Sequence, residues 1–299
     1  MSFTAHFHRA HQQVEDALFR CNNAGLAQNK AHSREGTVSG FQLSGDAPTA
    51  YTRFALKIVE PWTDDLILTA GCRDGDRVLD VACGTGVVAS RVNLVSRKLC
   101  YVTGIDINEA MLGAARSNSQ VEWRQGSATE LPFDADGFDV VLCQQGLQYF
   151  PDRPAAMREM ARVLAPGGRV CLNVWGALER QPFFVAAIDT IGQFLGADAQ
   201  APFYRAFSLN SADELRRLAL DAGLNNVRIR LEHRTMRYPV PARFVTGWVS
   251  GAPITAQFLA LPDDRKQAFI AGITERVATY VDDAGLAVPM ENHFLTASK

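Results

Sequence analysis

The chain has 299 residues, of which 47% are hydrophobic and 21% charged, and its formal net charge is -2 with a pI near 6.3. This composition is typical of a folded globular protein and excludes the disordered and fibrous classes. A net charge so close to zero gives no general attraction to nucleic acid or to anionic membranes, so neither partner is expected.

The sequence shows no sign of a membrane span or of export. Its apolar runs are shorter than the roughly 18 residues that a membrane-spanning helix needs. The first residues include His, Gln, Glu and Arg, where a signal peptide needs an apolar centre. The six cysteines form no C-x-x-C pair, so we expect them to be reduced and structural. We predict a cytoplasmic location without stable membrane insertion.

From about residue 77, short apolar runs alternate with amphipathic segments. This alternation is typical of a parallel β-sheet that is covered by helices on both faces. The sheet is therefore expected to have seven strands. The predicted strands are residues 77–82, 100–105, 121–125, 138–143, 169–175, 225–234 and, less regularly, 288–297.

Two helices between the later strands have clear start and stop signals. Asp152 can cap a helix that has Pro154 in its first turn, and the sequence APGG at 165–168 ends this helix. Ser211 and Glu214 fit a capping box at the start of a second helix, which a glycine ends.

Three segments fall outside this alternation. Residues 1–45 are rich in His, Asn, Gln, Ser and Gly, and we expect an N-terminal arm or lid there. Residues 178–208 are aromatic and broken by proline, whereas residues 240–284 have apolar residues at helical spacing. We predict one domain over residues 46–299, in which the last two segments are helical cover insertions over the strand ends, where an open α/β sheet binds its ligand.

The sequence VLDVACGTGVVA leads from an apolar strand through two glycines into an apolar helix. Gly84, Gly86 and Ala89 satisfy the dinucleotide fingerprint G-x-G-x-x-[GA], in which glycines let the backbone approach a pyrophosphate. Asp80 precedes this turn, and its carboxylate would repel a pyrophosphate by roughly several kcal/mol. The ammonium and sulfonium groups of S-adenosylmethionine suit both the acid and the glycines, so this cofactor is favoured over NAD(P).

Four blocks of the sequence jointly resemble the class I S-adenosylmethionine-dependent methyltransferases, in particular the ubiquinone/menaquinone-biosynthesis-like small-molecule branch. The blocks are VLDVACGTG, GIDINEAML, GSATELPFDADGFDVVLCQQGLQYF and RVLAPGGRV, and they follow in this order between about residues 48 and 176. The resemblance implies a Rossmann-like α/β fold whose seven-stranded sheet is mostly parallel with an antiparallel last strand. It also implies S-adenosylmethionine at the C-terminal ends of the first strands.

The resemblance implies roles for residues of the glycine turn. Asp80, Gly84 and Gly86 match the loop that holds the methionine part of the cofactor. Ala82 and Thr85 match positions that line this loop.

Further cofactor contacts are implied by the later blocks. Asp106 matches the acid that accepts both ribose hydroxyls, a role that suits a carboxylate because it has two acceptor oxygens. Ile107 and Met111 match residues that pack on the adenine, and Gln144 matches a residue that faces the methionine end. Tyr51 resembles an aromatic residue that closes over the sulfonium, although its spacing also suits an ordinary core residue.

The chain departs from the family pattern at Ser127. The family usually has an acid there, after Gly126, which reaches the adenine amino group. The Ser127 hydroxyl or the backbone of Ala128 can make this contact, but the charge-assisted part of it is lost. This departure leaves a non-catalytic, methyltransferase-like binding protein as one alternative, and the glycine spacing leaves an NAD(P)-binding oxidoreductase as another.

The acceptor is expected to be a small, largely apolar metabolite. The fourth predicted strand continues CQQGLQYF, without the [DNS]-P-P-[YFW] motif of many amino-methyltransferases, and no Pro-Cys nucleophile for cytosine methylation is present. Together with the low net charge, this argues against nucleic acid and favours an acceptor under a helical cover. The residues expected near the acceptor are Gln145, Gln148, Tyr149, Trp175 and Tyr204.

No catalytic residue and no metal site are assigned. Methyl transfer is an in-line displacement at an activated carbon, so it requires mainly alignment and exclusion of water. A general base is needed only for some nucleophiles. The histidine-rich sequence HFHRAH has no acid or cysteine partner, so we predict no metal ion there. The methylated atom and the oligomeric state stay open at this point.

Overall fold

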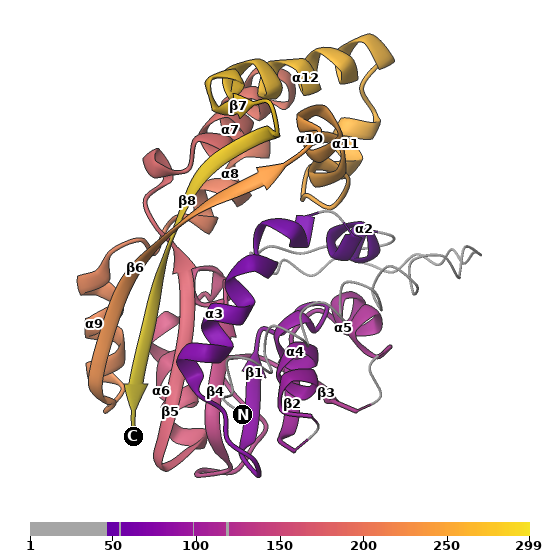
Figure 1. Ribbon diagram of the computed structural model, residues 1–299. Coiled ribbons are helices and arrows are strands. Elements are labelled where there is room, and N and C mark those ends of the chain that lie inside the picture. Colours follow the sequence, from indigo (N-terminus) through magenta and orange to yellow (C-terminus); the bar gives the residue numbers. More distant parts are fainter. Residues whose placement is uncertain (1–46, 54, 98, 118–119) are drawn as a thin grey trace.

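The computed structural model describes residues 47–53, 55–97, 99–117 and 120–299 (Figure 1). The predicted N-terminal arm, residues 1–45, lies outside the described residues, as do the histidines of HFHRAH.

A single mixed β-sheet forms the centre of the molecule. The strands follow the order β3-β2-β1-β4-β5-β8-β6, in which β1 to β5 are parallel and β8 is antiparallel to both β5 and β6. This is the predicted Rossmann-like α/β arrangement. The strands are β1 Arg77–Val81, β2 Tyr101–Asp106, β3 Glu122–Gln125, β4 Phe138–Gln144, β5 Leu164–Trp175, β6 Asn225–Tyr238, β7 Val281–Asp282 and β8 Gly285–Ser298.

The sheet differs from the prediction in three places. It gains β7, a strand of two residues that pairs only with β8. Strand β5 begins at Leu164, so the APGG sequence ends the preceding helix but belongs to the strand. Strands β6 and β8 are 14 residues each and pair along most of their length. Figure 1 shows that this long pair extends beyond the rest of the sheet, up to the helices at one end of the molecule.

Helices cover both faces of the sheet and the C-terminal ends of its parallel strands. The segments 178–208 and 240–284 consist mostly of helices and lie together at the upper end of the view in Figure 1. The helices are α2 Ala47–Arg53, η1 Ala55–Ile58, α3 Glu60–Ala70, α4 Val87–Val95, α5 Glu109–Ala115, η2 Leu147–Tyr149, α6 Arg153–Val163, η3 Leu178–Arg180, α7 Pro182–Leu195, α8 Ala197–Ala206, α9 Ala212–Asp221, α10 Pro241–Ser250, α11 Thr255–Leu259, α12 Asp263–Arg276 and η4 Ala278–Tyr280.

The predicted capping signals start two of these helices. The Asp152 side chain accepts the Ala155 N–H at 2.7 Å at the start of α6, and the Ser211 hydroxyl accepts the Glu214 N–H at 3.3 Å at the start of α9. Gly223 follows α9 with a φ of +81°, which favours glycine because it has no Cβ.

Two apolar clusters fill the two sides of the sheet. One lies under α6 and α9 and includes Met157, Met160 and Leu215. The other lies under α3 and α4 and continues without a break into the helices α7, α8, α10 and α12 of the cover, with buried residues such as Trp248 and Phe269. Among the described residues the cysteines are free, and no helix is long and apolar enough to cross a bilayer.

Candidate functional site

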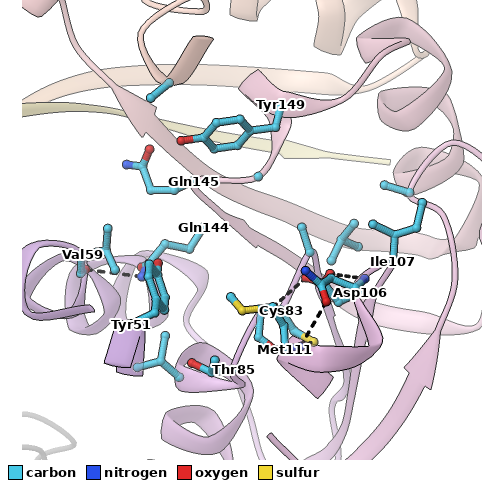
Figure 2. A pocket seen from close by; sticks show the side chains of 18 of the residues that line it. Tyr51, Val59, Cys83, Thr85, Asp106, Ile107, Met111, Gln144, Gln145 and Tyr149 are labelled. Carbon is cyan, nitrogen blue, oxygen red and sulfur yellow. Dashed lines mark hydrogen bonds between the residues drawn. The ribbon is translucent and has the colours of Figure 1, made fainter. Parts of the chain in front are cut away.

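A cavity of about 410 Å³ lies at the C-terminal ends of β1, β2 and β4, beneath the cover helices (Figure 2). Open α/β sheets bind ligands at this edge, and the volume lies in the range of small-molecule sites. All the residues predicted to bind the cofactor line this cavity except Gly86. The lining ones are Tyr51, Asp80, Ala82, Gly84, Thr85, Asp106, Ile107, Met111, Ser127, Ala128 and Gln144.

The glycine turn leaves β1 through left-handed backbone conformations. Ala82, Gly84 and Gly86 have φ angles of 57°, 55° and 83°, and they reverse the chain from β1 into α4. A Cβ on Gly84 would lie 3.3 Å from the Met111 Cε atom at the cavity wall. A Cβ on Gly86 would instead collide with the ring of Trp123. Gly86 therefore shapes the turn by packing against Trp123, and its contact with the cofactor stays a prediction.

Asp106 ties the end of β2 to the glycine turn. One carboxylate oxygen accepts the Gly84 N–H at 2.8 Å, and the other accepts the Asn108 N–H at 2.8 Å (Figure 2). Burial raises the pKa of Asp106, and the backbone N–H groups of Asn108, Gly84 and Ile107 offset part of this rise. An ionised carboxylate has about four acceptor sites, so these three N–H groups leave some capacity free. The carboxylate is thus held in a fixed position at the cavity wall and can still accept a hydrogen bond from a ligand.

Asp80 lies at the other side of the turn and is 1% exposed. Its Oδ2 atom accepts the Ala89 N–H at 3.0 Å, whereas its buried Oδ1 atom has no hydrogen-bond partner among the described residues. Desolvation raises the pKa of Asp80 to about 8, and the nearby Asp106 adds to the rise, while the Ala89 N–H lowers it. A buried acceptor without a partner is costly, so this site favours a cationic donor such as an ammonium group.

Gln144 and Tyr51 lie on the same side of the cavity in Figure 2. The Gln144 Nε2 atom donates to the Thr63 hydroxyl at 2.9 Å and to the Val59 carbonyl at 3.4 Å, which anchors the end of β4 to α3. Burial raises the pKa of Tyr51 to about 12, and the carboxylate of Asp106 contributes. Tyr51 therefore keeps its proton and presents a neutral aromatic ring to the cavity.

Ser127, the departure from the family pattern, lies in a tight turn at the cavity wall. Its hydroxyl is 2.8 Å from the Thr129 hydroxyl and accepts the Thr129 N–H at 3.2 Å. The hydroxyl is therefore partly engaged by its own turn.

The structure brings only some of the predicted acceptor residues to the cavity. Gln145, Tyr149 and Trp175 line it. Gln148 is fully buried behind Gln145, and its Nε2 atom donates to the Gln145 Oε1 atom at 2.7 Å. Tyr204 is 50% exposed and does not line the cavity. The preceding residue of α8, Phe203, faces the cavity instead.

Sequence reasoning missed the aromatic residues that the cover contributes. These residues come from α7, α8 and α10, which have no motif, and only their aromatic composition could have indicated them. The cover residues of the cavity with aromatic rings are Phe184, Phe203 and Trp248.

The lining carries few ionisable groups. Among the described lining residues there is no Lys, Arg or His. The ionisable ones are Tyr51, Asp80, Cys83, Asp106 and Tyr149, and burial raises the pKa of each of them. Both carboxylates belong to the ends of β1 and β2, so negative charge is confined to one half of the cavity.

The sequence is similar to known methyltransferases. The family described as "Methyltransferase domain" matches residues 79–172. The demethylmenaquinone methyltransferase of Staphylococcus aureus strain JH9 is 32% identical over 188 residues, which span 56% of this chain and 76% of that protein. The chain belongs to the class I S-adenosylmethionine-dependent methyltransferases. The cofactor of this methyltransferase is thus S-adenosylmethionine, and not a nicotinamide dinucleotide.

Solved structures show the same fold. A putative methyltransferase from an antibiotic biosynthesis pathway of Anabaena variabilis has a TM-score of 0.61 at 14% identity, covering 80% of this chain and 97% of that one. The phosphoethanolamine N-methyltransferase 2 of Haemonchus contortus, solved with S-adenosylmethionine, has a TM-score of 0.51 at 17% identity, covering 80% of this chain and 52% of that one. The residues of the methyltransferase cavity fit this cofactor, because Asp80 offers a buried acceptor and Asp106 a fixed carboxylate.

Proposed function

We propose that the methyltransferase transfers a methyl group from S-adenosylmethionine to a small, largely apolar metabolite that binds under the helical cover. The observation that carries this proposal is the division of one cavity into two unlike halves. The half at β1 and β2 contains the glycine turn, Asp80 and Asp106, whereas the half under the cover contains Trp175, Phe203 and Trp248 and no charged side chain among the described residues.

The first half would hold the cofactor. Asp106 would accept the ribose hydroxyls, and Asp80 would accept the ammonium group through its Oδ1 atom. Ile107 and Met111 line the wall on which an adenine ring would pack. Tyr51 would place its ring against the positive charge, because a cation is attracted to an aromatic face. The bound cofactor supplies a methyl carbon that its sulfonium already activates.

The second half would align the acceptor and exclude water. Aromatic walls favour an apolar body, and the lack of a countercharge disfavours an acidic or basic one. Burial raises the pKa of Tyr149 strongly, so its hydroxyl stays protonated and acts as a hydrogen-bond donor. No lining residue among the described ones is suited to act as a general base in this half. The chain's contribution to the rate would therefore be orientation and desolvation.

The Staphylococcus relative supports an apolar acceptor, because its name refers to demethylmenaquinone, an apolar molecule. The near-neutral net charge of the chain supports the absence of a nucleic-acid partner. The same proposal includes a cytoplasmic location and a single domain over residues 46–299, with residues 1–45 as an arm or lid.

A transfer of labelled methyl groups tests this function. The protein is incubated with methyl-labelled S-adenosylmethionine and an extract of the source organism, and the extract is separated into lipophilic metabolites, polar metabolites, protein and nucleic acid. We expect label in lipophilic metabolites, and much less of it with the Asp106→Ala variant at a limiting concentration of S-adenosylmethionine. Label in nucleic acid or in polar metabolites would contradict the proposal.

A further inference from the structure

Four amide side chains gather beside the cavity, where the C-terminal ends of β4 and β5 lie next to the middle of β8. We call Gln145, Gln148, Asn173 and Asn292 the amide cluster. The Gln145 Nε2 atom donates to the Asn292 Oδ1 atom at 2.6 Å, and the Gln145 Oε1 atom accepts from the Gln148 Nε2 atom at 2.7 Å. The Gln145 backbone N–H donates to the Asn173 carbonyl at 3.0 Å. Only Gln145 reaches the cavity, and the other three side chains are fully buried behind it.

The amide cluster has more hydrogen-bonding capacity than the described residues use. The buried Gln148 Oε1 atom, both side-chain polar atoms of Asn173 and the Asn292 Nδ2 atom have no partner among them. A buried polar atom without a partner destabilises the folded state, because it has lost its hydrogen bonds to water. Buried water behind Gln145 can satisfy these atoms, whereas the Gln145 amide is the part of the cluster that a ligand in the cavity can contact.

The backbone of Gln145 is held in a strained conformation. Its φ is 53°, in the left-handed region that is unfavourable for a residue with a Cβ. The turn is closely packed at the next residue, Gly146, where an added Cβ would lie only 2.7 Å from the Cys143 Sγ atom and 2.8 Å from the Ala82 Cβ atom. Strained backbone conformations of this kind are found most often at active sites and ligand-binding sites, where the surrounding structure holds them in place. The Gln145 amide is therefore oriented before any acceptor binds.

The surroundings of Gln145 favour an uncharged partner. In Figure 2 the Gln145 amide and the Tyr149 hydroxyl lie near each other, above Gln144 and Tyr51. No charged side chain lines the cover half among the described residues, so an unpaired carboxylate or ammonium group would lose its hydration without compensation. An amide and a hydroxyl can each pair with a neutral hydroxyl, carbonyl or amide group.

We propose that Gln145 determines acceptor specificity by binding an uncharged hydroxyl, carbonyl or amide group of an otherwise apolar acceptor. Gln148 and Asn292 are positioning residues that fix the Gln145 amide. This inference rests on the proposed function, since it names the acceptor class for the same cavity.

Three probes of matched shape test this inference. They are 4-propylphenol, 4-propylbenzoate and 4-propyltoluene, and their dissociation constants are measured by ligand-observed NMR with protein saturated with S-adenosylhomocysteine. We expect the phenol to bind about tenfold more tightly than both other probes. In Gln145→Met we expect the phenol to bind as weakly as the toluene, while the affinities for the toluene and for S-adenosylhomocysteine stay within about twofold of wild type.

Two variants separate specificity from general damage. Phe203→Leu should weaken phenol and toluene binding equally, because it changes only the apolar wall. Asn292→Leu should lower the ratio of phenol to toluene affinity without weakening toluene binding, which a purely structural role would not produce. A preference for the benzoate, or an unchanged phenol preference in Gln145→Met, would overturn the inference. Failure of all three probes to bind would instead overturn the proposed apolar acceptor site.

Discussion

The Asp106 carboxylate fixes the glycine turn, and in the proposed function it also accepts the ribose hydroxyls. Asp106→Ala removes hydrogen bonds to a charged group, so we expect S-adenosylhomocysteine binding to weaken by about 1.5–3 kcal/mol. Isothermal titration calorimetry measures this loss. The control is Asp283→Ala, which removes an exposed acid outside the cavity lining and should leave the dissociation constant unchanged. Equal constants for Asp106→Ala and wild type would exclude Asp106 from the site.

Asp80 should make both stability and binding depend on pH. Burial raises the pKa of Asp80 to about 8 in the folded protein. In the unfolded chain the same carboxyl group has a pKa of about 3.9. Between these values the folded state binds more protons than the unfolded state, so the Asp80 contribution to stability falls as the pH rises from about 4 to about 8. Asp80→Asn should therefore raise the melting temperature of the ligand-free protein at pH 8.

The charged form of Asp80 is also the form that binds an ammonium group. Affinity for S-adenosylhomocysteine should thus increase from about pH 6 to about pH 8 in wild type, with release of a proton. Asp80→Asn should bind more weakly and lose this dependence. Calorimetry in buffers of different ionisation enthalpy measures the number of protons that are released on binding. The same pH dependence in wild type and in Asp80→Asn would contradict the assignment.

Acids at strand ends were predictable from sequence, whereas residues in irregular turns were not. Asp80 and Asp106 follow from an apolar strand pattern that places each near the edge where ligands bind. Gln145 and Gln148 belong to a turn with one left-handed residue and a short 3-10 helix, and no sequence period tells which of them faces the cavity. The left-handed conformation of Gln145 could not be predicted from the sequence either, because glutamine rarely adopts it.

The turn between β1 and α4 depends on Gly86 for its packing against Trp123. Gly86→Ala would force a Cβ into the Trp123 ring in a left-handed conformation, so we expect destabilisation by about 2–4 kcal/mol. Urea unfolding without cofactor measures it. Gly113→Ala in the exposed part of α5 is the matched control: its Cβ meets nothing within 4 Å, and it should stabilise by about 0.5–1 kcal/mol. Equal stability of the two variants would contradict this role for Gly86.

Element types were easier to predict than element lengths. The helices α6 and α9 have capping side chains and apolar stripes, and their starts follow from these signals. The extension of β6 and β8 beyond the sheet depends on their pairing with each other and on contact with the cover, which are long-range interactions that local patterns do not contain. Strand β7 has two residues and exists only because the turn at Gly285 brings it beside β8.

The sheet and the cover share one apolar cluster, so they should unfold together. Trp175 at the end of β5 lies 5.4 Å from Phe184 of α7, measured between ring centroids, and Trp248 of α10 lies 5.5 Å from Phe203 of α8. We expect urea unfolding curves by tryptophan fluorescence and by far-UV circular dichroism to coincide in a single transition. An early, separate loss of helical signal would show that the cover is an independent unit, against the predicted single domain.

The position of the cavity follows from the arrangement of the whole molecule. Parallel strands end at one edge, the β6–β8 pair rises past that edge, and the cover helices pack there (Figure 1). The family blocks predicted residues that line the half of the cavity at β1 and β2. The acceptor half could not be predicted at the level of residues, because its aromatic side chains come from three helices whose contacts form only in the folded chain.

A crystal structure with bound S-adenosylhomocysteine tests the central claim most directly. We predict both ribose hydroxyls at hydrogen-bond distance from Asp106, the amino group facing the Asp80 Oδ1 atom, and the sulfur pointing toward Gln145 and the aromatic half. A ligand whose ribose lies away from Asp106, or one bound outside this cavity, would contradict the account.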